Sequence, residues 1–187
     1  MGTAVTRNAY FRVGIGILAD LGYGGLKLAE VCHRVGVTTG SFYHYFNNWA
    51  EYTHELIEHW LTSLTQERMD ALADEADPYR RIDLMMEVGL GLPFDAYAAV
   101  RAWSSVDARV RNVVVSLDAV RYDIVHGSAL EILGDERQAD AFAKWALYLL
   151  VGYEQSTLPR DHTAFTQLTT ALFRRILETG DMAVFPD

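Results

Sequence analysis

Apolar residues recur at intervals of three and four along almost the whole chain, and the alternating pattern of a β-strand is scarce. This spacing gathers apolar side chains on one face of an α-helix. Glycine, proline and polar capping residues separate the periodic segments from one another. We therefore expect an all-α protein of about nine helices, with no internal repeat and no low-complexity linker.

The first predicted helices are short and closely spaced. One helix begins near Tyr10 and is predicted to end at Gly22, Gly24 and Gly25, because glycine is the usual residue after a helix C-terminus. Two short helices follow, over residues 26–35 and 39–46, and the turn between them contains Gly36. Two helices joined by a short turn with a glycine form a helix-turn-helix.

The later helices are longer and carry clear start signals. Asn48, with Glu51 three residues further on, predicts a capping box at the start of a helix that runs to about residue 73. The pair Asp77 and Pro78 predicts the start of the next helix, since a cap followed by proline suits the first helical turn. Further helices are predicted over residues 94–105, 108–133, 135–156 and 163–179.

Charge is distributed unevenly along the chain. The 187 residues have a formal net charge of −9, yet residues 1–53 hold four basic and three acidic residues and are close to neutral. This asymmetry suggests a small domain over residues 1–53 and a strongly acidic one over residues 54–187. The overall acidity argues against a protein that coats nucleic acid through bulk charge.

The chain has no sign of a membrane or secreted protein. Its longest apolar stretch, around residues 146–152, is far shorter than the roughly 20 residues of a membrane span. The first residues lack a secretory apolar segment, and Cys32 is the one cysteine. We expect a cytoplasmic protein that makes no membrane contact. We expect Cys32 to be a small buried apolar residue, with a redox sensor as the alternative.

Residues 35–51 read VGVTTGSFYHYFNNWAE and hold the strongest functional signal. The Thr38 hydroxyl can cap the helix that follows, while Phe42 and Phe46 lie four apart and share one face, which we expect to be buried. Four polar or aromatic residues are then left outward, where they suit base edges and phosphates: Thr39, Ser41, Tyr43 and His44. An isolated aromatic run is more often an ordinary surface patch. The glycine turn and the two caps in register favour DNA binding instead.

These motifs resemble the signature of TetR-family transcriptional regulators over about residues 9–52. The resemblance rests on residues 36–38, on residues 40–46 and on Asn48, with weaker similarity at residues 18–23 and 31–32. It implies an N-terminal three-helix DNA-binding domain that binds a double-stranded operator, followed by a helical ligand-binding and dimerisation domain. The predicted DNA-binding residues are Lys27, Thr38, Thr39, Gly40, Ser41, Tyr43, His44, Tyr45 and Asn48.

Two departures from the family pattern bear on DNA affinity. The family usually opens the second helix with a Thr/Ser pair, where this chain has Leu26 and Lys27, and it usually has lysine where this chain has Trp49. A hydroxyl cap and a positive charge are therefore missing, although Lys27 can contact phosphate by charge. We expect modest phosphate affinity with a shallow salt dependence.

The last two predicted helices are apolar on more faces than one chain needs to cover. We predict that they pair with their copies in a four-helix bundle across a two-fold axis, so that the protein is a homodimer. The alternative is that both helices are core within one chain. The predicted interface residues are Phe142, Trp145, Leu149, Phe165, Leu168, Leu172 and Ile176.

Aromatic and methionine side chains with a few polar tips are typical of a small-molecule cavity. Core packing is the alternative for each of them, and their composition hints at an apolar or aromatic effector. The predicted pocket residues are Trp60, Met85, Met86, Phe94, Tyr97, Trp103, Tyr122, His126 and Tyr148.

Catalysis has little support in the sequence, which lacks the common nucleophile, phosphate-loop and zinc-protease motifs. The cluster of His54, Glu55, Glu58 and His59 has i, i+4 spacing, which does not fit the Glu-x-x-His rule of di-iron bundles. We expect that the protein is not an enzyme and that it has no metal site and no cofactor. The predicted function is that of a dimeric repressor released from a palindromic operator by a small effector. The alternative is a dimeric small-molecule-binding or protein-interaction module with a weakened helix-turn-helix.

Overall fold

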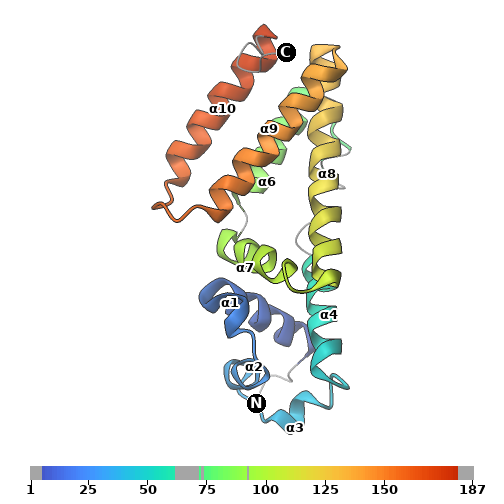
Figure 1. Ribbon diagram of the computed structural model, residues 1–187, viewed down its shortest axis with the longest axis vertical. Coiled ribbons are helices and arrows are strands. Elements are labelled where there is room, and N and C mark those ends of the chain that lie inside the picture. Colours follow the sequence, from blue (N-terminus) through green and yellow to red (C-terminus); the bar gives the residue numbers. More distant parts are fainter. Residues whose placement is uncertain (1–5, 62–71, 73, 92, 181–187) are drawn as a thin grey trace. The chain divides into compact units, whose positions relative to one another are not determined.

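The computed structural model describes residues 6–61, 72, 74–91 and 93–180. Over these residues it has nine helices and no strand, which confirms the all-α prediction (Figure 1). The helices are α1 (Arg7–Gly25), α2 (Leu28–Val35), α3 (Thr39–Phe42), α4 (Trp49–Leu61), α6 (Pro78–Leu90), α7 (Phe94–Ser104), α8 (Ala108–Leu133), α9 (Glu136–Gln155) and α10 (His162–Thr179).

The glycines of α1 and the end of α3 show how the observed bounds compare with the predicted ones, and one predicted helix lies partly outside the described residues. Helix α1 ends at Gly25, one of the glycines predicted to end it, and Gly22 forms a kink inside it with φ of 66°. The helix predicted over residues 39–46 ends at Phe42, because the chain tightens into i→i+3 bonds from His44 to Ser41 and from Tyr45 to Phe42. Most of the helix predicted beyond residue 61 lies outside the described residues.

The predicted capping signals are present in the structure. The Asn48 side chain accepts a hydrogen bond from the Glu51 amide at 2.9 Å, and the Glu51 carboxylate accepts one from the Asn47 amide at 2.9 Å. The capping box therefore closes one residue earlier than predicted. Asp77 caps α6 by accepting from the Tyr79 amide at 3.0 Å. These bonds satisfy amides that have no partner within their own helix.

The described residues fall into two packing units. The first packing unit comprises those among residues 1–67 and 93–117, which are α1 to α4, α7 and the beginning of α8. In it α7 lies along α1, where the rings of Tyr23 and Trp103 stack with centroids 4.9 Å apart. The rings of Trp60 and Tyr97 join α4 to α7 at 4.5 Å. The core of the helix-turn-helix thus continues into α7.

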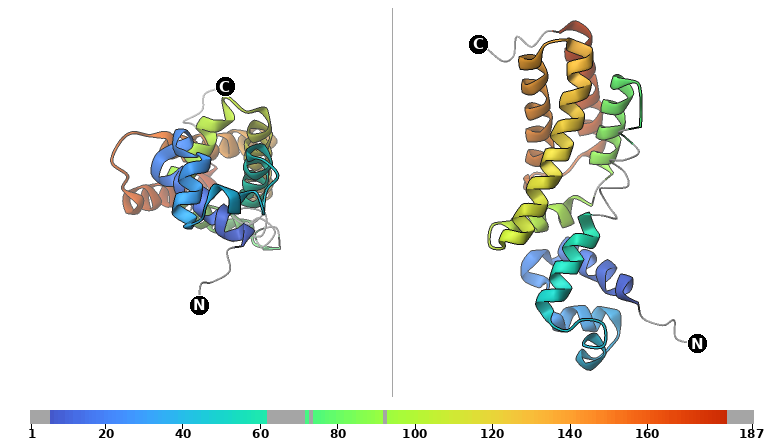
Figure 2. Two further views of the ribbon diagram at one scale, coloured as in Figure 1. Left: turned by 90° about the horizontal axis from the view of Figure 1, so that it is seen from below. Right: turned by 90° about the vertical axis from the view of Figure 1, so that its right-hand side faces the viewer.

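The second packing unit comprises the described residues among 68–92 and 118–187, which are α6, the remainder of α8, α9 and α10. These helices run alongside one another as a bundle (Figures 1 and 2). Phe142 of α9 and Phe173 of α10 pack edge to face with centroids 5.1 Å apart at its centre. The division at residue 53 into DNA-binding and ligand-binding domains is a functional one and stays a prediction.

No helix within the described ranges is both long enough and apolar enough to cross a membrane.

Candidate nucleic-acid interface and internal cavity

The turn between α2 and α3 is set by two residues. Gly36 adopts the left-handed conformation, with φ of 78°, and its amide donates to the Cys32 carbonyl oxygen at 3.0 Å. A glycine adopts this conformation without the steric cost that a Cβ adds. Two residues later, the Thr38 hydroxyl accepts a hydrogen bond from the Ser41 amide at 3.2 Å. The predicted cap of the recognition helix is therefore present.

Two buried phenylalanines pack α3 and the turn after it against the core. Phe42 is 0% exposed and Phe46 is 1% exposed, as the spacing of four predicts. They pack against Tyr10 with ring centroids 5.8 and 5.4 Å apart, and Tyr52 contacts both. Aromatic pairs of this kind stabilise a core beyond their buried area. Phe11 also contacts Phe46 and Tyr52. We call Tyr10, Phe11, Phe42, Phe46 and Tyr52 the aromatic anchor.

The opposite face of α3 and the turn after it is open to solvent. Thr38, Thr39, Gly40, Tyr43 and His44 are exposed, and Ser41 is half-buried beside the Thr38 hydroxyl at 3.3 Å. Asn48 is also exposed while its side chain caps α4. These predicted DNA-binding residues therefore lie within one short, continuous segment.

Tyr45 lies differently from its neighbours. Its ring packs on Tyr10 with centroids 5.2 Å apart and is half-buried, and its carbonyl oxygen accepts a hydrogen bond from Arg7. Tyr45 thus joins the anchored side of the segment, because the tighter turn after Phe42 rotates it away from the face of Tyr43.

The start of α2 has the features expected from the departures in sequence. Lys27 occupies the N-cap position, is exposed and makes no side-chain capping bond, while Leu26 is buried. Trp49 is half-buried and packs on Tyr52 with ring centroids 5.0 Å apart. An apolar residue at each site therefore adds to the core, where a hydroxyl or a cation would contact the DNA backbone.

Two of the basic residues near the helix-turn-helix are already paired with carboxylates. Arg7 donates to the Glu55 carboxylate at 2.6 and 2.5 Å, and its guanidinium lies over the Phe46 ring. Arg34 pairs with Asp20 at 2.5 Å and with Glu30 at 2.7 Å. In the described part of the chain, Lys27 has no carboxylate partner. Lys27 is therefore a stronger candidate for phosphate contact than Arg7 or Arg34.

Cys32 packs inside the helix-turn-helix. Its side chain is 4% exposed, and burial raises the pKa of its thiol. A thiol with a raised pKa is protonated at neutral pH and reacts slowly. This environment favours the interpretation of Cys32 as a buried apolar residue over a redox sensor.

The His54 cluster of α4 is divided among other contacts. Glu55 binds Arg7, His59 stacks on Phe11 with ring centroids 4.9 Å apart, and His54 pairs with Glu58 at 3.2 Å. Within the described ranges no three His, Cys, Asp or Glu side chains gather as metal ligands.

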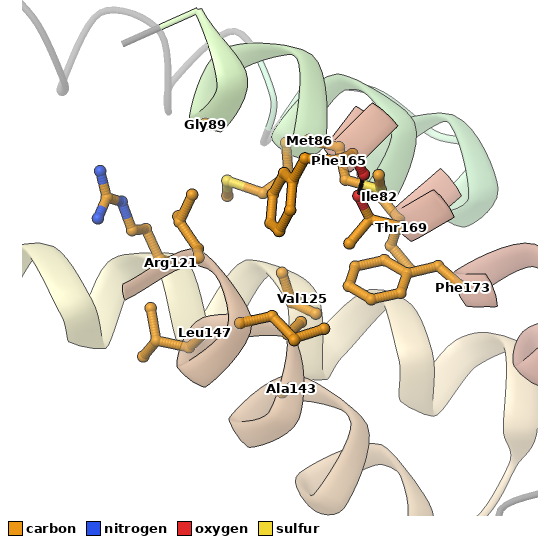
Figure 3. A pocket seen from close by; sticks show the side chains of 14 residues that line it. Ile82, Met86, Gly89, Arg121, Val125, Ala143, Leu147, Phe165, Thr169 and Phe173 are labelled. Carbon is orange, nitrogen blue, oxygen red and sulfur yellow. Dashed lines mark hydrogen bonds between the residues drawn. The ribbon is translucent and has the colours of Figure 1, made fainter. Parts of the chain in front are cut away.

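The second packing unit contains a partly open cavity between all four of its helices (Figure 3). Its volume is about 60 Å³, room for a few water molecules. Almost every lining side chain is apolar. The lining consists of Ile82, Met85, Met86 and Gly89 from α6, Arg121 and Val125 from α8, Ala143, Ala146, Leu147, Leu149 and Leu150 from α9, and Phe165, Thr169 and Phe173 from α10.

Met85 and Met86 are the two predicted pocket residues that line this cavity. Four others form the core of the first packing unit, where each is at most 4% exposed: Trp60, Phe94, Tyr97 and Trp103. Tyr148 points to solvent with 68% of its surface exposed.

Tyr122 and His126, also predicted for the pocket, instead join α8 to α9. Their rings stack on each other with centroids 5.4 Å apart. The Tyr122 hydroxyl donates to Asp140 at 2.7 Å, and His126 pairs with Glu136 at 3.1 Å. The hydrogen bond to Asp140 raises the pKa of Tyr122 to about 12. Both side chains are thus held by polar contacts outside the cavity.

Several cavity residues were absent from the sequence prediction, among them Arg121, Val125 and Thr169. Each is one of many similar residues on a long helix, so no local pattern marks it. The apolar stripe of the α10 segment was the available signal, since Phe165 and Phe173 both belong to it.

The predicted dimer residues occupy three different environments. Phe142 and Ile176 are buried within the chain. Trp145, Leu149 and Phe165 are half-buried, and the last two line the cavity. Leu168 and Leu172, four apart on α10, are 71% and 41% exposed. Core packing accounts for the first two residues, whereas the exposed leucines have no cover in one chain.

Comparison with protein families supports the motif-based resemblance. Residues 13–51 match the model described as bacterial regulatory proteins, tetR family. This match confirms the resemblance over the helix-turn-helix. No curated protein matches the chain.

Solved structures of transcriptional regulators share the fold over nearly the whole chain. A regulator from Rhodococcus sp. Rha1 is 16% identical, with a TM-score of 0.76 over 93% of this chain and 97% of that one. A putative regulator from Saccharomonospora viridis, in complex with choline, is 13% identical, with a TM-score of 0.72 over 92% and 95% of the two chains. AibR, in complex with isovaleryl coenzyme A and operator DNA, is 12% identical, with a TM-score of 0.69 over 89% and 96%.

Proposed function

We propose that this chain, whose residues 13–51 match the tetR family of bacterial regulatory proteins, is a dimeric repressor released from its operator by a small effector. The observation that carries the proposal is the division of residues 38–48 into two sides. Phe42 and Phe46 are buried, while Thr39, Tyr43 and His44 are exposed. An exposed polar and aromatic segment held on a rigid base is what major-groove recognition requires.

Dimerisation is part of this proposal because a single helix of this length reads few base pairs. Two recognition helices about 34–36 Å apart read successive major grooves of a palindrome. Leu168 and Leu172 offer an exposed apolar strip on α10, and Tyr148 is exposed on α9. A two-fold axis beside these helices would cover the strip with its own copy.

The cavity of the second packing unit supports a ligand response. Its lining is almost entirely apolar, which suits an effector with an apolar body. Two structures similar to this chain were solved with small molecules bound, choline in one and isovaleryl coenzyme A in the other. The cavity has room for only a few water molecules, so a larger effector must extend beyond it or displace the surrounding helices.

The effector can act only through a difference in affinity between the state that binds the operator and the state that does not. By linkage, operator DNA then weakens effector binding by the same factor. Mutual exclusion of the two ligands is therefore part of the proposal.

The alternative function is a dimeric ligand-binding or protein-interaction module that has lost useful DNA affinity. The observations that favour it are Leu26 and Trp49, which pack into the core where the family usually presents a hydroxyl and a lysine. Lys27 and the exposed α3 face support DNA binding against it.

Selection of the purified full chain against a random duplex library at moderate salt tests the proposal, with sequencing of the bound pool. Enrichment of an inverted repeat with half-sites about one helical turn apart is the expected result. A variant with Tyr43→Ala and His44→Ala, both at exposed positions, should lose the enrichment while remaining folded. A folded, dimeric wild-type protein that enriches no sequence would favour the binding module instead.

A further inference from the structure

Arg121 is the one charged residue among the 14 that line the cavity. It is 4% exposed and lies at one end of the cavity, with Phe173 at the opposite end (Figure 3). A buried guanidinium needs an acceptor, because the cost of removing its charge from water is large. The cavity therefore has an apolar body and a single cationic end.

Glu154, near the end of α9, is the buried carboxylate beside this cation. It is 0% exposed, and its Oε1 lies 3.7 Å from Nη1 of Arg121. The Asp118 carboxylate lies 3.9 Å from the same nitrogen. Both distances exceed the roughly 2.7–2.9 Å of a charge-assisted N–H···O bond. Nη1 of Arg121 thus forms an ion pair with each of these carboxylates at a longer range than a hydrogen bond.

We propose that the cavity takes an amphipathic monocarboxylate, whose carboxylate binds Arg121 in exchange for Glu154 and whose apolar body lies toward Phe173. This inference rests on the proposed function, since it assigns a ligand class to the same cavity. A planar guanidinium fits a carboxylate through two parallel hydrogen bonds, which favours an anion over a neutral polar group.

The exchange would also connect the ligand to α9. Glu154 lies in the last turn of the helix that carries Tyr148 and Trp145. A carboxylate displaced from Arg121 inside the protein is left without its cation, so the end of α9 must rearrange or admit water. Ligand binding at Arg121 would thus change the end of the helix that bears part of the predicted dimer surface.

The test is isothermal titration calorimetry of the full chain at pH 7.5 with three probes of equal chain length: octanoate, 1-octanol and octyltrimethylammonium. Octanoate should bind more tightly than 1-octanol by on the order of tenfold, the gain expected for a charged hydrogen bond. Arg121→Gln should abolish this preference and leave the affinity for 1-octanol unchanged. Arg137→Gln, at an exposed position of α9, is the matched control and should have no effect.

Glu154→Gln separates a ligand-binding role of Arg121 from a structural one. If the ligand competes with Glu154, this variant binds octanoate several times more tightly than the wild type does. If Arg121 only braces Glu154, the variant binds octanoate equally well or less well, and the proposal is overturned. The double variant Arg121→Gln with Glu154→Gln leaves no unpaired charge in the core. Loss of the octanoate preference in this folded variant therefore supports recognition of the carboxylate by Arg121.

The remaining outcomes assign failure to one proposal or the other. Binding of 1-octanol with no preference for octanoate overturns the inference and leaves the ligand cavity in place. Tighter binding of octyltrimethylammonium also overturns it and points to Glu154 as the recognising group. Failure of all three probes to bind overturns the inference together with the ligand-binding part of the proposed function.

Discussion

The hydroxyl group of Tyr52 donates a hydrogen bond to the backbone carbonyl oxygen of Tyr10 over 3.1 Å, joining α4 to α1 inside the aromatic anchor. Gly14 leaves the space for this contact, because a Cβ at this position would lie 2.3 Å from the same hydroxyl oxygen and 2.9 Å from a methyl carbon of Leu56. The distance between α1 and α4 therefore depends on the absence of a side chain at residue 14.

Gly14→Ala should destabilise the protein by about 1–3 kcal/mol, since the added methyl group forces Tyr52 and Leu56 apart. Gly16→Ala is the matched control in the same helix, because a Cβ there meets nothing within 4 Å. It should instead stabilise by about 0.5–1 kcal/mol through helix propensity. Urea unfolding of both variants measures the difference, and equal effects would contradict this account of Gly14.

The stability of the protein should fall as the pH rises above 10. Burial raises the pKa of Tyr52 above its ordinary value of 10.0, so the folded chain keeps this proton when the unfolded chain loses it. The contribution of Tyr52 is complete below pH 10 and decreases by up to about 1.4 kcal/mol per pH unit above it. Urea unfolding between pH 8 and 11 gives the free energy of unfolding as a function of pH. It should fall less steeply with pH for Tyr52→Phe than for Tyr43→Phe, which changes an exposed residue. Identical slopes would count against a buried, protonated Tyr52.

Operator binding should depend only weakly on salt, and Lys27 should account for part of that dependence. Lys27→Gln should lower the slope of log affinity against log salt by about 1, the amount of one phosphate contact. Arg34→Gln removes the same charge from a residue already paired with Asp20 and Glu30, so its slope should change less. Fluorescence anisotropy on the selected operator at several salt concentrations gives both slopes. A wild-type slope equivalent to six or more phosphates would refute the expected weakness.

Leu168→Glu should convert the dimer to a monomer at micromolar concentration. A charge within an apolar interface should raise the dimer dissociation constant by roughly 30-fold or more, equivalent to about 2 kcal/mol. Leu158→Glu is the matched control, because Leu158 is 74% exposed in the loop between α9 and α10. Light scattering distinguishes the two masses. A dimeric Leu168→Glu protein would place the interface elsewhere.

Gly89→Leu should remove the ligand response and leave operator binding intact. Gly89 lines the cavity, where a Cβ would lie 3.5 Å from a methyl carbon of Leu150, so a larger side chain fills the space that a ligand needs. Gly127→Leu, in α8 with nothing within 4 Å of its Cβ, is the control for the gain in helix propensity. Operator binding with and without effector is measured for both variants. A Gly89→Leu protein that still responds would exclude this cavity as the effector site.

Features of the DNA-binding segment that depend on neighbouring residues could be predicted from the sequence. Thr38 caps α3, and Phe42 and Phe46 are buried, because each follows from spacing within one helical turn. The early end of α3 could not be predicted this way. Phe46 must reach Tyr10 and Tyr52, and the tighter turn that brings it there also turns Tyr45 inward.

Features that depend on packing between distant helices were harder to predict. Trp60 and Tyr97 have the composition of pocket residues, yet they contact each other in the first packing unit, since α7 lies against the helix-turn-helix. Arg121 carries no local signal, because its position at the cavity depends on three other helices. Whether Leu168 is exposed likewise depends on the packing of the bundle, which covers Phe173 and Ile176 instead.

The four-residue length of α3 has a consequence for how operator preference can change. A helix this short is unstable alone, so its shape is imposed by Phe42 and Phe46 and owes little to Thr39, Tyr43 and His44. Substitutions at these three exposed positions should therefore alter which bases are read at little cost in folding. Base recognition and folding therefore depend on different residues of this segment, and new operators can be sought by randomising three codons.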